Sequence, residues 1–349
     1  MAMLSPKENY LRLARGEMPD YVPNFTMGGI WPPSGTPTKY HPALLAAPPI
    51  FPMGGGPGAT EWKDMWGVPH VANAETNWQG LPKPNAFILD DITKWPDVVK
   101  RPDVAAADTF DWEKMAKDST AHINRETTGV ICMAGNGPFQ ALIAFMGFEE
   151  GLCALVEEPE TCRELLDFMA DFYMPYIEKT IEYFRPDIVY LLDDTAAQRD
   201  PFFSISVFRD IFKPVYARYG KMAKDRGIPI QFHNCGRAED FVEDYIDIGV
   251  KYWDPAQECN NLLAVKEKYR GKIAVVGGYN FYPDEKYNNV TEDHVRATVR
   301  ATLDRYAEGG GYAWLGGYLG RSDEMDIAAK INTWINDEVD TYGMNFYRK

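Results

Sequence analysis

The chain has 349 residues, 45% hydrophobic and 25% charged, the composition of a globular protein with room for one large α/β barrel or two smaller domains. Its net charge of −15 argues against a nucleic acid or an anionic membrane surface as the main partner. It has no run of ~20 apolar residues for a membrane helix, no apolar core for a signal peptide and only five cysteines. We therefore expect a cytoplasmic protein without a disulfide framework.

The first third of the chain differs in composition from the rest. A short strand is predicted at Tyr21–Met27, and residues 28–120 are then rich in Gly, Pro and Trp. Because long ordered loops in compact domains are often lids or binding loops, we interpret residues 28–120 as an elaboration of short strands and turns over the mouth of the main fold. Trp31 and Trp66, with Tyr279, could line a pocket for a flat apolar substrate. The alternative is that the tryptophans only pack as a structural cap.

From residue 128 onward, short β-rich runs alternate with longer amphipathic segments. The predicted strands are Gly129–Ala134, Ile188–Leu192, Ile228–His233, Lys251–Asp254, Ile273–Val276 and Tyr312–Leu315. Helices are expected at 161–184, with a kink at Pro175, and at about 205–226, 237–248, 261–270, 291–308 and 323–341. Strands that alternate with helices form right-handed βαβ units and a parallel sheet. We therefore predict a single (β/α)8 TIM barrel domain over residues 1–349.

Every predicted strand ends in polar or Gly-rich residues, and in a barrel the chemistry lies at these carboxyl ends. The most informative end is His233, which is followed by Asn234, Cys235 and Gly236. Because side chains alternate along a strand, His233 and Cys235 should point the same way. An imidazole and a thiol together favour zinc. Two residues do not define a metal site, and a buried cysteine beside a hydrogen-bonded histidine is the alternative.

A second polar strand end is Asp193-Asp194. Neighbours on a strand point to opposite faces, so at most one of the two carboxylates faces the barrel centre. That carboxylate could be a metal ligand, a general acid for a leaving oxygen or a partner of His233. The alternative is a pair of helix-capping aspartates before Ser204. Gln257, after the predicted strand Lys251–Asp254, would hydrogen-bond substrate or close the strand end.

Several stretches together resemble the uroporphyrinogen decarboxylase-like superfamily. They are Asp193-Asp194, Phe208 to Pro214, Gly227 to Gly236, Asp254 to Gln257, Lys266 to Tyr269 and Val276 to Gly278. The resemblance covers roughly residues 125–340 well and the first third loosely, through residues 62–68. It implies a (β/α)8 barrel. It also implies one of two activities, which are cofactor-free decarboxylation of uroporphyrinogen and zinc-dependent methyl transfer to or from the cobalt of a corrinoid protein.

The methyltransferase branch is the better match. The decarboxylases carry an Arg-rich motif near the N-terminus that binds substrate carboxylates, and the corresponding residues 24–31 contain no arginine. The resemblance implies that His233 and Cys235 are zinc ligands. The third ligand of the branch, a cysteine after the last strand, has no counterpart between residues 312 and 322. We expect Cys259 to replace it, with Glu258, Asp193 and Asp194 as the alternatives.

The resemblance and the aromatic residues together predict a methyltransferase of the O-demethylase type. It would move a methyl group between a small substrate, best an aryl methyl ether, and the cobalt of a corrinoid (cobalamin) on a separate protein. Zinc would act as a Lewis acid on the ether oxygen, or would generate a thiolate in the reverse direction, and Asp193 or Asp194 would be catalytic. The alternatives are a cofactor-free decarboxylase of a smaller acid, with Arg199 or Arg321 at the mouth, and a non-catalytic binding protein.

Overall fold

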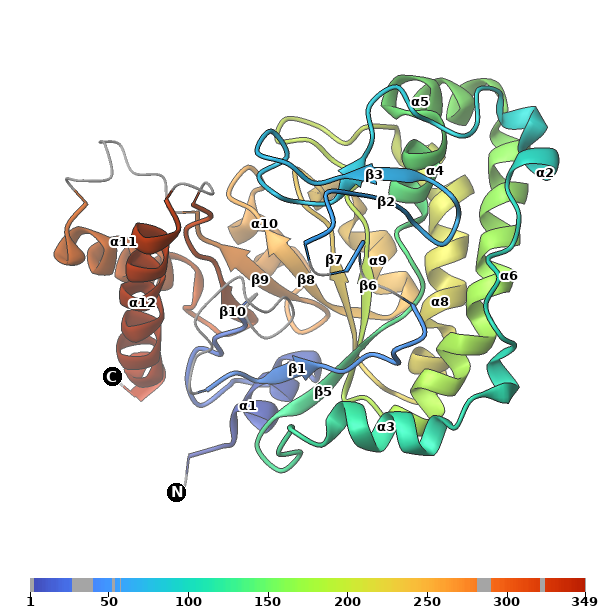
Figure 1. Ribbon diagram of the computed structural model, residues 1–349. Helices are drawn as coiled ribbons and strands as arrows, with labels where there is room; N and C mark the ends of the chain where they lie inside the picture. Colours follow the sequence, from blue (N-terminus) through green and yellow to red (C-terminus); the bar gives the residue numbers. More distant parts are fainter. Residues whose placement is uncertain are drawn as a thin grey trace.

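Figure 1 shows the computed structural model, a mixed α/β fold in which helices surround a curled parallel sheet. The structure describes residues 3–26, 40–51, 54–56, 58–280, 290–320 and 324–348. The strands of the sheet are β1 (Ala43–Leu45), β5 (Gly129–Met133), β6 (Ile188–Leu192), β7 (Ile230–His233), β8 (Val250–Ala256), β9 (Ala274–Gly278) and β10 (Tyr312–Leu315). They lie side by side in that order, and every neighbouring pair is parallel. This curled sheet is consistent with a TIM-like fold.

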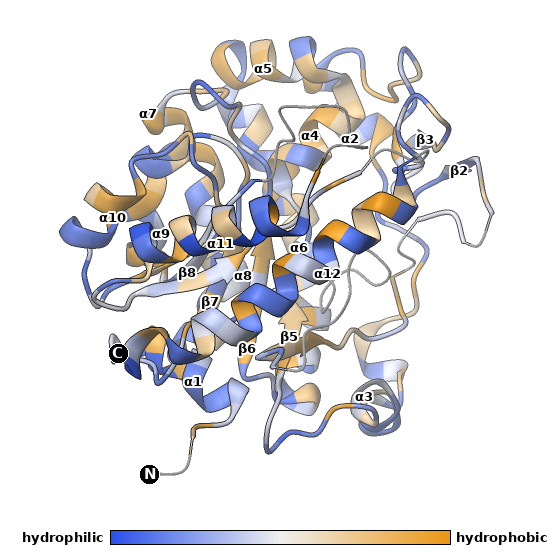
Figure 2. Cartoon of the chain, turned by 90° about the vertical axis from the view of Figure 1, so that its left-hand side faces the viewer, coloured by the Kyte–Doolittle hydropathy of each residue, from blue (hydrophilic) through white to orange (hydrophobic). Residues whose placement is uncertain are grey.

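The helices between the strands cover the outer side of the sheet. They are α4 (Pro138–Met146), α5 (Phe148–Glu157), α6 (Pro159–Phe184), α7 (Ile205–Val207), α8 (Lys213–Asp225), α9 (Val242–Ile248), α10 (Leu262–Lys268), α11 (Glu292–Tyr306) and α12 (Met325–Tyr342). All six strands predicted after residue 128 are confirmed, as are the helical segments to within a few residues. Figure 2 shows hydrophobic and hydrophilic residues interleaved along α11 and α12, as expected of helices with one buried face.

The segment between α7 and α8 forms a π-helical turn, η4 (Phe208–Phe212). The Lys213 N–H donates to the Phe208 carbonyl, five residues back, instead of four. Pro214 explains this wider turn, because its ring has no N–H and would clash with the carbonyl four residues back in a regular helix. The turn keeps Phe208 and Phe212 buried and leads into the face of α8 that carries Tyr216.

The interior of the curled sheet holds its own buried cluster, which includes Tyr190 and Tyr252. The helix α1 (Pro6–Ala14) closes this interior at the amino ends of the strands. Its Lys7 N–H donates to Thr127 O just before β5, and the Lys7 ammonium pairs with Asp187 just before β6. From α1, Tyr10 enters the interior and stacks on Tyr252, with ring centroids 4.4 Å apart. Side chains alternate along each strand, and the residues that point away from the interior pack outward against the helices.

The N-terminal strand is shorter than predicted. Of the segment Tyr21–Met27, Asn24 forms an isolated parallel bridge to Trp314 of β10, and residue 27 lies outside the described residues. Phe25 N–H donates to the Trp314 carbonyl and Trp314 N–H to the Pro23 carbonyl. Proline has no N–H to extend a strand ladder, which limits the pairing. The sequence also gave no signal for β1.

Residues 58–120 contain short strands and helical turns and one longer helix. Three strands, β2 (Glu61–Lys63), β3 (Pro69–Val71) and β4 (Leu81–Pro82), form a separate antiparallel sheet. The helical turns η2 (Ile92–Lys94), α2 (Trp95–Val98) and η3 (Ala107–Thr109) and the helix α3 (Trp112–Thr120) follow. Within the described part of the chain, no single helix is long and apolar enough to cross a membrane; α4 and α5 reach that threshold only when this bent pair is counted together.

Candidate metal centre

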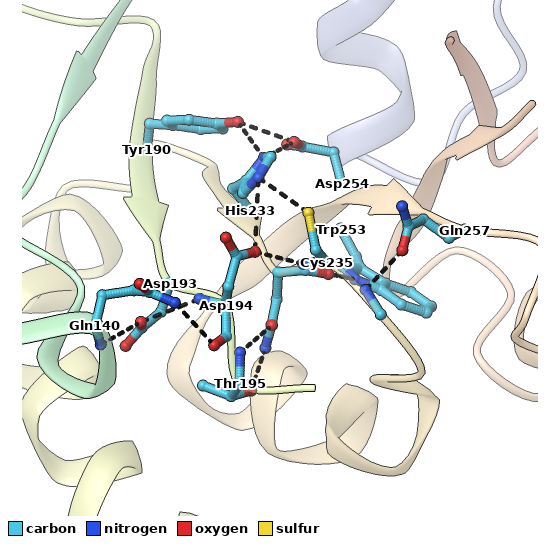
Figure 3. A network of polar contacts seen from close by, with 12 residues as sticks. Gln140, Tyr190, Asp193, Asp194, Thr195, His233, Cys235, Trp253, Asp254 and Gln257 are labelled. Atoms are coloured by element: carbon cyan, nitrogen blue, oxygen red, sulfur yellow. Dashed lines mark hydrogen bonds and ion pairs between the residues drawn. The ribbon is translucent and has the colours of Figure 1, made fainter. Parts of the chain in front are cut away.

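Three potential metal ligands meet at the carboxyl ends of β6 and β7 (Figure 3). His233 is the last residue of β7, Cys235 follows two residues later, and Asp194 lies two residues beyond the end of β6. The His233 Nε2 atom is 3.6 Å from Cys235 Sγ and 3.9 Å from Asp194 Oδ1. All three ligand atoms lie within 4.8 Å of one another. His233 and Cys235 therefore point the same way, as the alternation of the strand predicts.

Backbone hydrogen bonds fix the loop that carries Cys235. The Cys235 N–H donates to Asp194 Oδ1 at 3.0 Å, and the next N–H, of Gly236, donates to Gln257 Oε1 at 2.7 Å. Gly236 has a φ of 84°, and a Cβ there would lie 2.3 Å from the Ala196 carbonyl oxygen, so only glycine fits. The side-chain oxygen of Gln257 thus closes the strand end in this arrangement.

The residue between the two ligands holds the loops after β6 and β7 together. Asn234 donates to Thr195 Oγ1 at 2.7 Å and accepts the Thr195 N–H at 2.9 Å. It also donates to the Tyr245 hydroxyl at 2.6 Å, and it is fully buried. Because it points away from His233 and Cys235, Asn234 supports the site without facing it.

A buried carboxylate orients the imidazole of His233. Asp254, on β8, is fully buried, and its Oδ1 lies 2.8 Å from His233 Nδ1. The Tyr190 hydroxyl, from β6, donates to the same oxygen at 2.9 Å. An ionised carboxylate only accepts hydrogen bonds, so Nδ1 carries a proton toward Asp254, and Nε2, the atom left to bind a metal once it is deprotonated, faces Cys235 and Asp194. This is how a carboxylate supports a metal-binding histidine.

The electrostatics of the cluster suit a cation. Burial acts to lower the pKa of His233, but its hydrogen bonds to Asp254 and Cys235 and the charges of these groups together outweigh burial and hold that pKa well above the ordinary value. Burial raises the pKa of Cys235, and His233 opposes the rise. Among the residues that the structure describes, His233 is the one basic group within ion-pair distance of Asp194 or Asp254. A carboxylate, an imidazole and a thiol without a lysine or arginine partner are a donor set that fits a metal ion.

Asp193 lies outside this cluster and caps α4. Its carboxylate accepts the N–H groups of Phe139 and Gln140, at 2.8 and 3.1 Å, and the Tyr216 hydroxyl at 2.7 Å. Negative charge at a helix N-terminus is favourable. Burial raises the pKa of Asp193 to about 6, and these hydrogen bonds oppose the rise. Asp193 thus caps the helix after β5, whereas we had considered the one that begins after Ser204.

Asp194, and not Cys259, is the third residue clustered with His233 and Cys235 among the described residues. Cys259 lies in the turn after β8, where its Sγ is 3.5 Å from Asn260 Nδ2, and it is not one of the three clustered ligands. Glu258 is exposed in the same turn. Asp194 was among the alternatives, and its position beside His233 follows from the parallel pairing of β6 with β7.

Of the aromatic residues predicted to bind substrate, the two that the structure describes, Trp66 and Tyr279, contact different partners. The Trp66 indole N–H donates to the Tyr173 hydroxyl of α6 at 2.8 Å, in the core outside the sheet. Tyr279 packs against Trp314 in a tilted arrangement, with ring centroids 4.6 Å apart, in the same outer core. Trp31 lies outside the described residues. Conversely, Asp254 and Tyr190 were not predicted as site residues, although a polar residue at the inner end of a buried strand was a usable signal.

The amino-acid sequence that carries this site matches a known protein family. The uroporphyrinogen decarboxylase (URO-D) family matches residues 91–316, a stretch that includes all three clustered ligands. The chain belongs to the uroporphyrinogen decarboxylase family. This confirms the resemblance read from the sequence. Membership in the family still leaves the reaction open, because one fold supports several chemistries.

One of the solved structures that match this chain supports the same fold. A methyltransferase from Methanosarcina mazei matches with a TM-score of 0.58 and 15% identity, over 97% of this chain and 100% of that chain. Dispersin B matches with a TM-score of 0.37 and 10% identity, over 67% of this chain and 76% of its own. A 3-keto-L-gulonate-6-phosphate decarboxylase from Vibrio cholerae O1 matches with a TM-score of 0.24 and 11% identity, over 64% of this chain and 92% of that chain. No curated protein matches. At such identities the first likeness shows the fold alone.

Proposed function

We propose that the protein is a zinc-dependent methyltransferase that takes a methyl group from a small methyl ether. The observation that carries the proposal is the cluster of Asp194, His233 and Cys235, with an imidazole nitrogen 3.6 Å from a thiol and 3.9 Å from a carboxylate oxygen. Three protein ligands with a fourth position left for substrate are typical of catalytic zinc sites. The structural likeness to a protein described as a methyltransferase is in keeping with this activity.

Each residue of the cluster has a distinct task in this proposal. Asp254 and Tyr190 keep the His233 ring in one orientation, with Nε2 free to bind. Cys235 supplies a soft sulfur ligand and Asp194 a hard oxygen ligand. The Asp194 side chain is 43% exposed, so this side of the cluster is open to an incoming substrate. When bound, zinc would polarise the ether oxygen as a Lewis acid and so weaken its bond to the methyl carbon.

We propose the cobalt of a corrinoid on a separate cytoplasmic protein as the methyl acceptor, as the family resemblance implies. The proposal that the substrate is an aryl ether is based on the aromatic composition of residues 28–120. The positions of Trp66 and Tyr279 do not add to it, because both side chains pack in the outer core. We also propose that the sheet closes as an eight-stranded barrel through residues 22–26. The bridge from Asn24 to β10 supports closure, as does the 2.8 Å contact of His41 Nε2 with Thr26 O just before β1.

The decarboxylase alternative has less support from the site. A substrate with carboxylate groups needs cationic partners, and no lysine or arginine of the described residues pairs with Asp194 or Asp254. Arg199, one of the two arginines considered for this role, is exposed, and Arg321 lies outside the described residues. Two buried or half-buried carboxylates would repel an anionic substrate from this end of β7.

The test begins with zinc content. Anaerobically purified protein should contain about one zinc per chain, and His233→Ala and Cys235→Ala should each lose it. Cys259→Ala is the matched control, because it removes a thiol from a neighbouring strand end and should keep the metal. The zinc-loaded protein is then incubated with cob(I)alamin and methoxybenzene or methanol, and methylcobalamin formation is followed by absorbance. A parent protein that binds no added zinc would overturn the proposal.

A further inference from the structure

A chain of buried hydrogen bonds runs through the interior of the sheet from α1 to the candidate metal centre. The Tyr10 hydroxyl is 2.9 Å from Gln231 Oε1, and Gln231 Nε2 is 2.5 Å from Asp254 Oδ2. The other oxygen of Asp254 is 2.8 Å from His233 Nδ1, the contact drawn in Figure 3. Tyr10, Gln231 and Asp254 are all fully buried. The chain therefore joins the two ends of the sheet interior without contact with water.

The donors and acceptors of this chain can be arranged in only one way. The carboxylate of Asp254 only accepts, so Gln231 must turn its NH2 group toward Asp254 and its Oε1 away from it. That Oε1 then needs a donor, and the Tyr10 hydroxyl supplies it. Without the hydroxyl, Oε1 would be buried without a donor, at a cost of about 1–3 kcal/mol. The amide would gain by rotating, and Asp254 would lose one of its three donors.

Tyr10 is itself held in a fixed position. Its ring stacks between Tyr252, at 4.4 Å, and Phe25, at 5.3 Å. The Tyr252 hydroxyl donates to the Tyr10 carbonyl oxygen at 2.9 Å, and Asn9 Nδ2 donates to the Tyr21 carbonyl at 2.9 Å. A hydroxyl on a ring clamped in this way can dictate the orientation of a neighbouring amide, because the cost of moving it is the loss of this packing.

We propose that Tyr10 is a positioning residue for the metal centre, acting through Gln231 and Asp254 on His233. The hydroxyl fixes the amide, the amide fixes the carboxylate, and the carboxylate fixes the imidazole with Nε2 toward Cys235. The inference rests on the proposed metal site and extends its support to the first helix of the chain. Metal affinity and the docking of α1 are then coupled, although the two lie at opposite ends of the sheet interior.

The test compares Tyr10→Phe with Tyr252→Phe. Both variants keep the stacked rings and lose one buried hydroxyl, but only Tyr10 donates to Gln231. Zinc affinity, measured by competition with a chelator, should fall about 3- to 10-fold in Tyr10→Phe and less than 2-fold in Tyr252→Phe. Asp254→Asn, which acts on His233 directly, should cost about 10- to 100-fold. Equal affinities of the two tyrosine variants would overturn the role of Tyr10.

A metal-free measurement separates this inference from the proposed function. The chain has five histidines, so 15N-labelled histidine gives a tractable NMR spectrum. The proton on His233 Nδ1, assigned by its loss in His233→Ala, should exchange slowly in the parent and in Tyr252→Phe, and faster in Tyr10→Phe. Slow exchange in all three would refute the inference, whatever the zinc content. A parent without zinc but with faster exchange in Tyr10→Phe would refute the proposed function and leave the positioning role intact.

Discussion

Zinc binding should release about two protons per chain at pH 7. Asp254 holds the pKa of His233 well above its ordinary value, and burial raises the pKa of Cys235, so both ligands carry a proton in the metal-free protein. Zinc binds only the deprotonated forms, so protons compete with the metal below these pKa values. With two protons displaced, the apparent association constant should rise about 100-fold for each pH unit in this range. An ordinary histidine and cysteine would release only about one proton at pH 7.

The number of protons can be read from calorimetry. Zinc is titrated into metal-free protein at pH 7 in two buffers of different ionisation enthalpy, and the difference in heat gives the protons released. Cys235→Ser should reduce the count to about one. Asp194→Asn should keep it near two with a weaker affinity, because both proton donors remain. A count of one or less in the parent would refute the raised pKa of His233 and the role of Asp254.

Three further predictions separate the site from the scaffold. Asp193→Asn should lower the free energy of unfolding in urea by about 3 kcal/mol, because buried donors lose their acceptor, whereas Asp194→Asn should weaken zinc binding with little change in stability. Cys259→Ser should retain zinc with unchanged chelator competition; zinc loss would restore Cys259 as the third ligand. Trp66→Phe should cost about 1 kcal/mol in thermal unfolding, through the lost bond to Tyr173. It should leave KM for the methyl ether unchanged, and a raised KM would place Trp66 at the substrate.

The sheet could be predicted from the sequence because its strands are buried on both faces. A run such as Ile188–Leu192 is apolar throughout, and a glycine such as Gly249, at a φ of 101°, marks the end of the preceding helix. The N-terminal segment gave a weaker signal. Its pairing to β10 rests on Asn24, and β1 has only three residues. Periodicity over three residues carries too little information to identify a strand.

Only the part of the site that depends on the alternation of side chains along a strand could be predicted from the sequence. His233 and Cys235 follow from that rule, and so does the opposite orientation of Asp193 and Asp194. Which carboxylate faces the histidine depends on where α4 begins, a tertiary fact that the local sequence does not contain. Cys259 lies outside the cluster of the described residues because of the path of the turn after β8, and chain order alone does not report such a path.

The three candidate metal ligands all come from one strand-helix-strand unit, residues 188–236, with β8 supplying only the support of Asp254. The cluster is therefore a local unit of the chain. Within the described structure, the ends of β5, β9 and β10 contribute no residue to the cluster, so their loops can change without touching the metal. Divergence of substrate among relatives should concentrate in those loops. An engineer could likewise exchange them to alter which methyl compound is accepted, while keeping the reactive centre as it stands.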